Sequence, residues 1–90
     1  MLAQEGGRVL SALAERGSSD ASIRADLLRR GVSEQELETA LAAVAPEGER
    51  AERLSSRVGG GLRAARALAR KGYPEDVIER TLRQDIAEEP

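Results

Sequence analysis

The chain repeats part of its own sequence at an offset of 41 residues. When residues 23–41 are laid over residues 64–82, six of the 19 aligned positions are identical. The identical pairs are Leu27 with Leu68, Arg29 with Arg70, Gly31 with Gly72, Glu34 with Glu75, Glu38 with Glu79, and Leu41 with Leu82. Repeats of this length are typical of helical units that cannot bury their apolar faces alone and therefore stack on their neighbours. We therefore expect an all-α fold of tandem three-helix repeats that form an elongated helical array.

Each copy of the repeat has the pattern of a helix, a glycine stop and a second helix. In the first copy, Ser19 or Asp20 is placed to cap a helix over about residues 21–30. Gly31 follows that helix, where a residue in the left-handed conformation commonly ends it. The second copy follows the same plan, with Gly72 as its stop.

Two further helices and a glycine run complete the expected organisation. A short helix over about 7–16 precedes the first copy, and Pro46 is placed to open a helix that runs to about Val58. The glycines at 59–61 should break that helix and form a hinge to the second copy. The expected segments are an N-terminal helix left from a preceding repeat at 1–18, a first complete repeat at 19–60, and a second, partial repeat with an acidic tail at 61–90.

The composition argues against chemistry at a catalytic site. The chain has no cysteine and no histidine, and Tyr73 is its only aromatic residue. The absent residue types include the usual zinc ligands and the commonest general base. We therefore expect no enzyme activity, no cofactor and no metal site.

No apolar run approaches the roughly 20 residues that span a bilayer, and the N-terminus lacks the pattern of a signal peptide. A cytoplasmic location is expected.

The charge is unevenly distributed along the last third of the chain. The net charge is only −2, which argues against a protein that coats nucleic acid through non-specific electrostatic attraction. Residues 62–73, however, carry four bases and no acid, and residues 74–90 carry six acids against two arginines. Arg63, Arg66 and Arg70 fall within about 60° of one another on a helix. They form either a face that grips phosphates or an acidic protein surface, or a solubilising face that packs loosely on the acidic tail.

Further candidate contact residues follow from the repeat. Lys71 extends the basic set of the second copy, and Arg24, Arg29 and Arg30 form the equivalent set in the first copy. Those residues that end a helix could instead serve only as partners of the helix dipole. Tyr73 is expected to pack between two helices, with a place in a partner contact as the alternative. Without aromatic stacking platforms, reading of single-stranded bases is not expected.

The repeats resemble a known family of regulatory proteins. The stretch 67–82 reads Ala-Leu-Ala-Arg-Lys-Gly-Tyr-Pro-Glu-Asp-Val-Ile-Glu-Arg-Thr-Leu and resembles the last repeat of the RecX regulatory proteins. Residues 22–41 resemble the middle repeat of that family, and residues 49–54 resemble its third helix. The resemblance covers most of the chain, although most of the family's N-terminal repeat is lacking.

The resemblance implies a role without catalysis in DNA repair by homologous recombination and in the SOS response. RecX proteins bind the RecA recombinase and its filament on single-stranded DNA, and they limit filament growth. By this resemblance the chain would be a modulator, and specifically an inhibitor, of a RecA-type recombinase, with basic residues near the DNA or an acidic recombinase surface. No membrane and no small-molecule substrate are implied.

Another class of function remains open from the sequence. The glycine–tyrosine turn at Gly72 and Tyr73 also resembles that of ubiquitin-associated domains, which bind ubiquitin through a loop with Met-Gly-Phe or Met-Gly-Tyr. In this chain Lys71 stands in the place of the methionine. A helical adaptor or a self-associating module is the third possibility.

Overall fold

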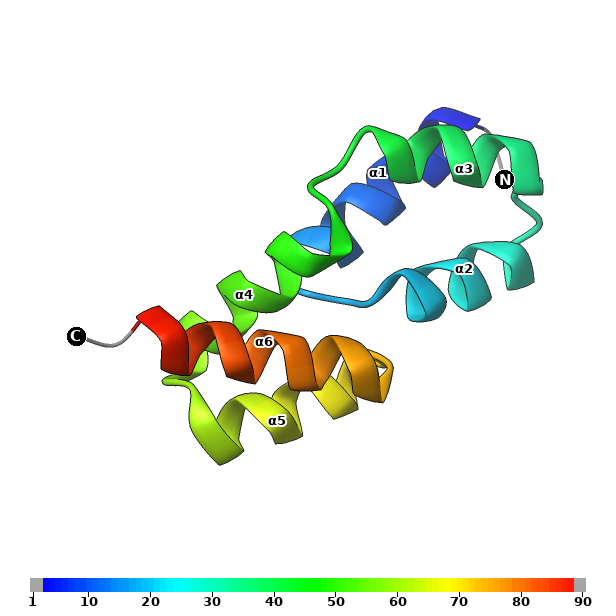
Figure 1. The fold of residues 1–90 in the computed structure, drawn as a ribbon. Coiled ribbons are helices and arrows are strands. Elements are labelled where there is room, and N and C mark those ends of the chain that lie inside the picture. The colour runs from blue at the N-terminus through cyan, green and yellow to red at the C-terminus, as the bar shows by residue number, and fades with distance from the viewer. Residues whose placement is uncertain (1–2, 89–90) are drawn as a thin grey trace.

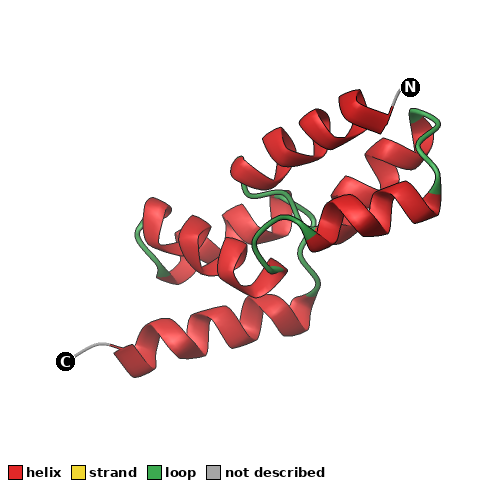
Figure 2. Ribbon diagram, turned by 90° about the horizontal axis from the view of Figure 1, so that it is seen from above, coloured by secondary structure: helices red, strands yellow, loops and turns green. Residues whose placement is uncertain are grey.

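The computed structural model describes residues 3–88, and this part of the chain contains six α-helices and no strand (Figures 1 and 2). The helices are α1 (Ala3–Glu15), α2 (Asp20–Arg29), α3 (Glu34–Ala42), α4 (Glu47–Val58), α5 (Gly61–Arg70) and α6 (Glu75–Glu88). The expected all-α fold class is therefore confirmed.

The six helices form two three-helix bundles that follow each other along the chain. Helices α1, α2 and α3 surround one apolar cluster, and α4, α5 and α6 surround a second one. The first bundle lies at the right of Figure 1 and the second at the left. The molecule measures 47 × 19 × 18 Å, so the array is elongated. The buried residues of the first cluster are Leu10, Ala14, Ile23, Leu27, Val32 and Leu37, and those of the second are Ala51, Leu54, Ala67, Leu68 and Tyr73.

Among the described residues, the packing changes from one core to the other near residue 46, inside the segment 19–60, which the sequence pattern predicts as one repeat. Leu10 and Ala14 of α1, the helix expected to be left from a preceding repeat, pack in the first core with residues of α2 and α3. Helix α4 was expected to belong with 19–60, but its Ala51 and Leu54 face the core that α5 and α6 share. In the described residues, α1 thus packs with α2 and α3, and α4 packs with α5 and α6.

The offset of 41 residues also relates buried positions in the two bundles. The paired buried positions are Leu10 with Ala51, Ile23 with Ala64, Leu27 with Leu68, and Val32 with Tyr73. The second bundle thus has smaller side chains at two of these positions and a larger one at Tyr73. Tyr73 has a large side chain. It therefore fills part of the space that the two smaller alanines leave in the second bundle.

The helix ends follow the capping and glycine signals of the sequence, except at the N-terminus. The Ser19 hydroxyl caps α2 by accepting a hydrogen bond from the Ser22 amide at 3.1 Å. Gly31 and Gly72 have φ angles of 88° and 90°, the left-handed conformation expected for both. Helix α1, however, begins at Ala3 instead of residue 7. Helix α1 therefore includes Gly6 and Gly7, although glycine inside a helix costs about 1 kcal/mol relative to alanine.

Candidate interaction surface

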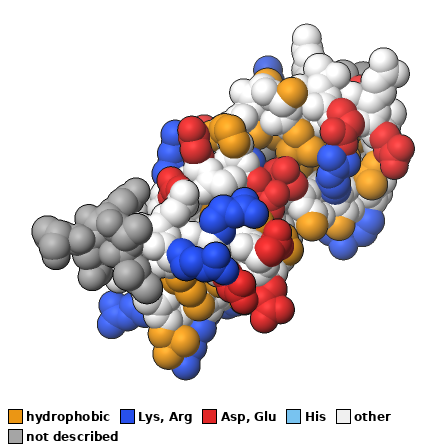
Figure 3. Space-filling view, in the orientation of Figure 1, with side chains coloured by type: hydrophobic (Ala, Val, Ile, Leu, Met, Phe, Trp, Pro, Cys, Tyr) orange, Lys and Arg blue, Asp and Glu red, His pale blue; other side chains and the backbone are white. Residues whose placement is uncertain are grey.

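Helix α5 presents a basic outer face because its inner face is fully used by the second core. Ala64, Ala67 and Leu68 are buried against α4 and α6. Successive residues lie about 100° apart around a helix. With its inner face in the core, α5 therefore points its three arginines outward. All three are exposed to solvent: Arg63, Arg66 and Arg70. Figure 3 shows basic and apolar side chains together over α5, at the lower left.

The three arginines of α5 carry charge that the described residues do not neutralise. None of them forms an ion pair with any acid that the structure describes. The sequence of α5, GLRAARALAR, contains no acid of its own. An unpaired guanidinium keeps all five N–H donors available for a carboxylate or phosphate. We call Arg63, Arg66 and Arg70 the α5 basic face.

Lys71 lies at the end of α5, where its backbone has a structural role. Its main-chain carbonyl accepts hydrogen bonds from the Ser19 amide and the Ser22 hydroxyl, each at 3.0 Å. These bonds tie the end of α5 in the second bundle to the start of α2 in the first. The Lys71 side chain is half-exposed and can add to the α5 basic face.

The equivalent basic set of the first copy differs from α5, because each of its arginines is paired. Arg24 forms an ion pair with Glu38 of α3. Arg29 and Arg30 both contact Asp26, at 3.0 Å and 3.4 Å. The hydrogen bond from Arg29, with the charge of Arg30, lowers the pKa of Asp26. The electrostatic equivalence that the repeat predicts is therefore not found in the structure.

The reason for this difference is visible in the sequence. Asp26 precedes Arg29 and Arg30 by three and four residues, the spacing at which side chains on a helix meet. At the aligned position of the second copy stands Ala67, so Arg70 and Lys71 have no such acid. The exchange from acid to alanine at this position leaves Arg70 and Lys71 without the acid that pairs Arg29 and Arg30.

Tyr73 belongs to the interior of the protein and not to its surface. Its side chain is only 5% exposed and packs in the second core. The hydroxyl lies 3.5 Å from the main-chain oxygen of Ser18, which it approaches as a weak donor. Burial raises the pKa of Tyr73 above its usual value of 10.0. The packing role is thus confirmed, and the ring is not placed for the partner contact that was the alternative.

Arg50 is the polar residue that sequence reasoning missed. Arg50 lies on α4 and is only 4% exposed. Its side chain reaches across the junction of the two bundles. Its guanidinium donates to the main-chain oxygens of Ala45 at 2.7 Å and Ser18 at 3.1 Å, and to Asp20 Oδ1 at 2.6 Å. In the sequence, Arg50 and Arg53 look alike, since both follow acids on the same helix. No local signal separates the buried arginine from the exposed one.

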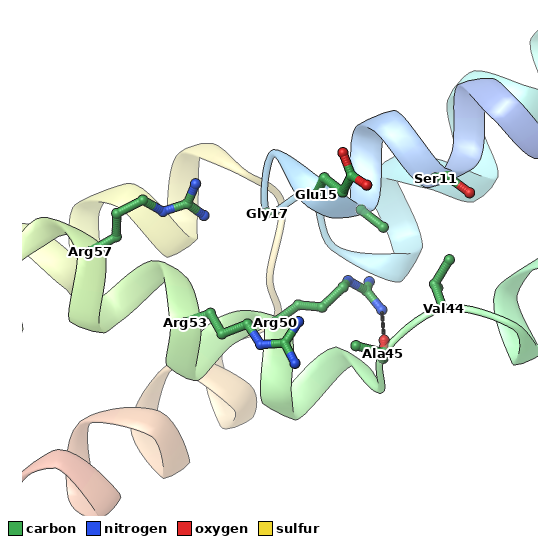
Figure 4. A pocket seen from close by; sticks show the side chains of 9 residues that line it. Ser11, Glu15, Gly17, Val44, Ala45, Arg50, Arg53 and Arg57 are labelled. Carbon is green, nitrogen blue, oxygen red and sulfur yellow. Dashed lines mark hydrogen bonds between the residues drawn. The ribbon is translucent and has the colours of Figure 1, made fainter.

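A pocket of about 230 Å³ lies beside this junction, between the end of α1 and α4 (Figure 4). Its lining residues are Ser11, Ala14, Glu15, Gly17, Val44, Ala45, Arg50, Arg53 and Arg57. The Arg50 guanidinium is already bonded to three oxygens, so it ties the bundles together and is not available as a free cation. The Glu15 carboxylate, which lines the pocket from α1, also opposes an anionic ligand. We therefore assign this pocket a structural role.

Metal binding and membrane insertion are two other kinds of site that the described residues can be checked for. Among them, no group of three or more His, Cys, Asp or Glu side chains could hold a metal ion. None of the helices in this part of the chain combines the length and the apolar character that crossing a membrane requires. The α5 basic face is therefore the candidate surface that we consider further.

Comparison with known proteins adds no relative: no family model, no curated protein and no solved structure matches the chain.

Proposed function

We propose that the chain is a non-catalytic modulator, and specifically an inhibitor, of a RecA-type recombinase, and that it binds the recombinase's nucleoprotein filament on single-stranded DNA. The single observation that supports this proposal is the α5 basic face, three exposed arginines with no acid beside them on the helix. The resemblance of the repeats to the RecX proteins supplies the identity of the partner.

The dimensions of the basic face suit a contact with a few acidic groups. Arg63 and Arg70 are seven residues apart, which corresponds to about 10 Å along a helix. That length covers one or two carboxylates on a protein, or two neighbouring phosphates on a strand. With so few cations and a net charge of −2, binding to DNA alone should be weak. The recombinase should therefore supply most of the contact, with the DNA backbone as a secondary partner.

The ubiquitin-associated alternative finds less support. A domain of that class binds ubiquitin through its Met-Gly-Phe or Met-Gly-Tyr loop, whereas here Lys71 stands in the place of the methionine and Tyr73 is only 5% exposed.

The DNA-dependent ATPase activity of RecA on single-stranded DNA provides the test. We expect dose-dependent inhibition by the full chain, and we expect added salt to weaken it because the contact is electrostatic. The variant Arg63→Glu with Arg66→Glu should lose inhibition while its helicity by circular dichroism stays unchanged. No inhibition at tens of micromolar would refute the recombinase proposal. Inhibition that survives the double substitution would refute the role of the basic face.

A further inference from the structure

The outer side of α5 carries two parallel stripes of different chemistry. Leu62, Ala65 and Ala69 recur at i, i+3 and i+7, and the arginines of the α5 basic face recur at the same spacing one residue further along. At about 100° per residue, each set occupies a sector of about 60°, and the two sectors adjoin. The buried residues of the helix fill the opposite side. We call Leu62, Ala65 and Ala69 the α5 apolar stripe.

The second bundle leaves the α5 apolar stripe largely uncovered. Leu62 is 65% exposed, which makes it the more exposed of the two large hydrophobic residues on the described surface. Ala69 is also exposed, and Ala65 is half-buried. The carbon stems of arginines can lie along apolar surface while the charged ends stay at its edge, so the basic face adds to the apolar area. The outer side of α5 is thus apolar along one edge and cationic along the other.

A partner that satisfies both stripes must offer acids and apolar groups side by side. A phosphate backbone satisfies only the basic face, because phosphates offer nothing that would bury Leu62. A protein surface can place carboxylates against the guanidinium groups and, next to them, apolar side chains against the leucine. The combination of the two stripes therefore favours an acidic protein surface over a nucleic acid.

The spacing of the stripes favours a helix as the matching element. Along the axis of α5, Arg63 and Arg66 are about 4.5 Å apart, and Arg66 and Arg70 about 6 Å. A helix that lies alongside repeats its own side chains at the same steps, whereas one face of a strand repeats only every 6.6 Å or so. The small side chains of Ala65 and Ala69 leave room for the interaxial distance of about 8–10 Å at which helices pack.

The corresponding side of α2 in the first bundle lacks this arrangement. Leu28, the residue aligned with Ala69, is 42% exposed. Ser22 and Ala25, however, stand at the positions of the first two arginines of the basic face. Arg24, which takes the place of Ala65, is paired with an acid of α3. An exposed leucine without a row of unpaired arginines beside it thus provides a matched control within the same protein.

We propose that the outer side of α5 docks an acidic amphipathic helix of the partner. Apolar side chains of that helix cover the α5 apolar stripe, and carboxylates beside them bind the arginines of the α5 basic face. Leu62 is the residue that distinguishes such a helix from other polyanions. The assignment of this helix to the recombinase rests on the proposed function, whereas the chemistry of the face does not.

Titration of the full chain with a designed peptide, followed by NMR chemical shifts, tests the face without recombinase or DNA. The peptide is a helix with leucines at i, i+3 and i+7 and glutamates along the flank of that stripe. A second peptide has the same composition in an order that spreads both residue types around the helix. The first peptide should shift the amide signals of α5, and the second should bind about tenfold more weakly or worse. Equal binding of the two peptides would overturn the proposal, because α5 would then recognise negative charge alone.

Substitution of the two exposed leucines identifies the apolar contact. Leu62→Ser should weaken binding of the amphipathic peptide about tenfold, because burial of a leucine accounts for at least that factor. Leu62→Met, which keeps an apolar side chain of similar volume, should bind nearly as the parent does. Leu28→Ser is the matched control and should leave the affinity unchanged. Equal losses in the two serine variants, or no loss in Leu62→Ser, would overturn the proposal.

A single-stranded oligonucleotide of thymidines represents the competing class of partner. The parent chain should bind it weakly, and Leu62→Ser should bind it as the parent does, since phosphates do not cover the leucine. An oligonucleotide that shifts the α5 signals more strongly than the amphipathic peptide at the same concentration would overturn the proposal in favour of a phosphate-binding face.

Binding to the RecA filament separates this proposal from the proposed function. Leu62→Ser should lose affinity for the filament by the same factor of about ten. A parent chain that binds the amphipathic peptide but not the filament would refute the recombinase as the partner and support the docking face. A Leu62→Ser variant that binds the filament as tightly as the parent would overturn the docking of a helix and leave the recombinase as the partner.

Discussion

At the scale of single residues, Arg50 makes the most consequential contact of the fold. It joins α4 to the turn between α1 and α2 through Ser18 and Asp20. Removing one partner of a buried charge pair leaves the other partner and its neighbours without hydrogen bonds, and this typically costs about 3–5 kcal/mol. In a domain of this size such a loss is a large part of the total stability.

The first prediction concerns this arginine. Arg50→Met should lower the free energy of unfolding by about 3 kcal/mol, the low end of the usual range because Asp20 is partly exposed. Urea denaturation followed by circular dichroism measures the change. Arg53→Met on the same helix is the matched control, since that side chain is 69% exposed, and it should change stability by less than about 0.5 kcal/mol. Equal effects of the two substitutions would contradict the role of Arg50.

The second prediction compares the two glycine stops. Gly31 and Gly72 have nearly the same positive φ, so alanine at either position carries a similar backbone cost of about 1–2 kcal/mol. A Cβ at Gly31 would meet nothing within 4 Å, whereas at Gly72 it would collide with the hydroxyls of Ser22 and Ser19. Gly72→Ala should therefore lower the melting temperature clearly more than Gly31→Ala. Equal shifts would show that the bundles are not in contact at this point.

The third prediction concerns pH. Burial raises the pKa of Glu47 above its ordinary 4.5, and the nearby negative charge of Asp20 adds to the effect. The folded protein thus holds this proton to a higher pH than the unfolded chain, so the cost of ionising Glu47 appears as the pH rises above 4.5 and is absent below it.

The substitution Glu47→Gln removes that cost. The variant should be more stable than the parent at pH 7, and the difference should vanish at pH values below the ordinary pKa of the carboxyl. Urea midpoints at the two pH values measure this. Glu49→Gln, on the exposed side of α4, is the control. A variant that is less stable than the parent at pH 7 would contradict the account.

At the scale of elements, helix α5 has one face buried in the core and the other exposed at the surface. Leu68 is fully buried and Leu62 is 65% exposed, although both are leucines on the same ten-residue helix. We expect Leu68→Ala to cost about 3 kcal/mol through lost burial and a cavity. Leu62→Ala should cost less than about 0.5 kcal/mol. Denaturant unfolding of the two variants compares them, and similar losses would mean that α5 is rotated from the orientation described.

The elements themselves could largely be predicted from the sequence. Cap residues such as Ser19, and stops such as Gly31 and Gly72, act within one turn of the chain, so local pattern is enough to place them. The grouping of helices could not be predicted in this way. The apolar stripe of α4 is compatible with either bundle, and only its contacts with Ala67, Leu68 and Tyr73 decide between them.

The candidate site was partly predictable for the same reason. The α5 basic face follows from helical spacing and from the absence of acids on that helix. The neutralisation of Arg29 and Arg30 by Asp26 is also a local pattern and could have been found. The pairing of Arg24 with Glu38 and the burial of Arg50 arise between elements, so helical spacing within one element does not show them.

At the scale of the whole molecule, the two bundles are tied together by contacts from the turn between α1 and α2 and from the first residues of α2. Ser19 and Ser22 bond to the carbonyl of Lys71, and Arg50 bonds to Ser18 and Asp20. These contacts fix the direction of the α5 basic face relative to the first bundle. A partner therefore meets an elongated surface about 47 Å long with charge concentrated on separate helices.

Binding to a preassembled RecA filament on single-stranded DNA tests the central claim most directly. The filament is immobilised through the DNA, and the affinity of the full chain is compared with that of two double variants. Arg63→Gln with Arg66→Gln and Arg29→Gln with Arg30→Gln change the net charge equally, but only the first pair lies on the α5 basic face. We expect the first variant to bind about tenfold more weakly or worse, equivalent to about 1.4 kcal/mol, and the second to bind nearly as the parent does. No binding by the parent chain, or an equal loss in both variants, would contradict the claim.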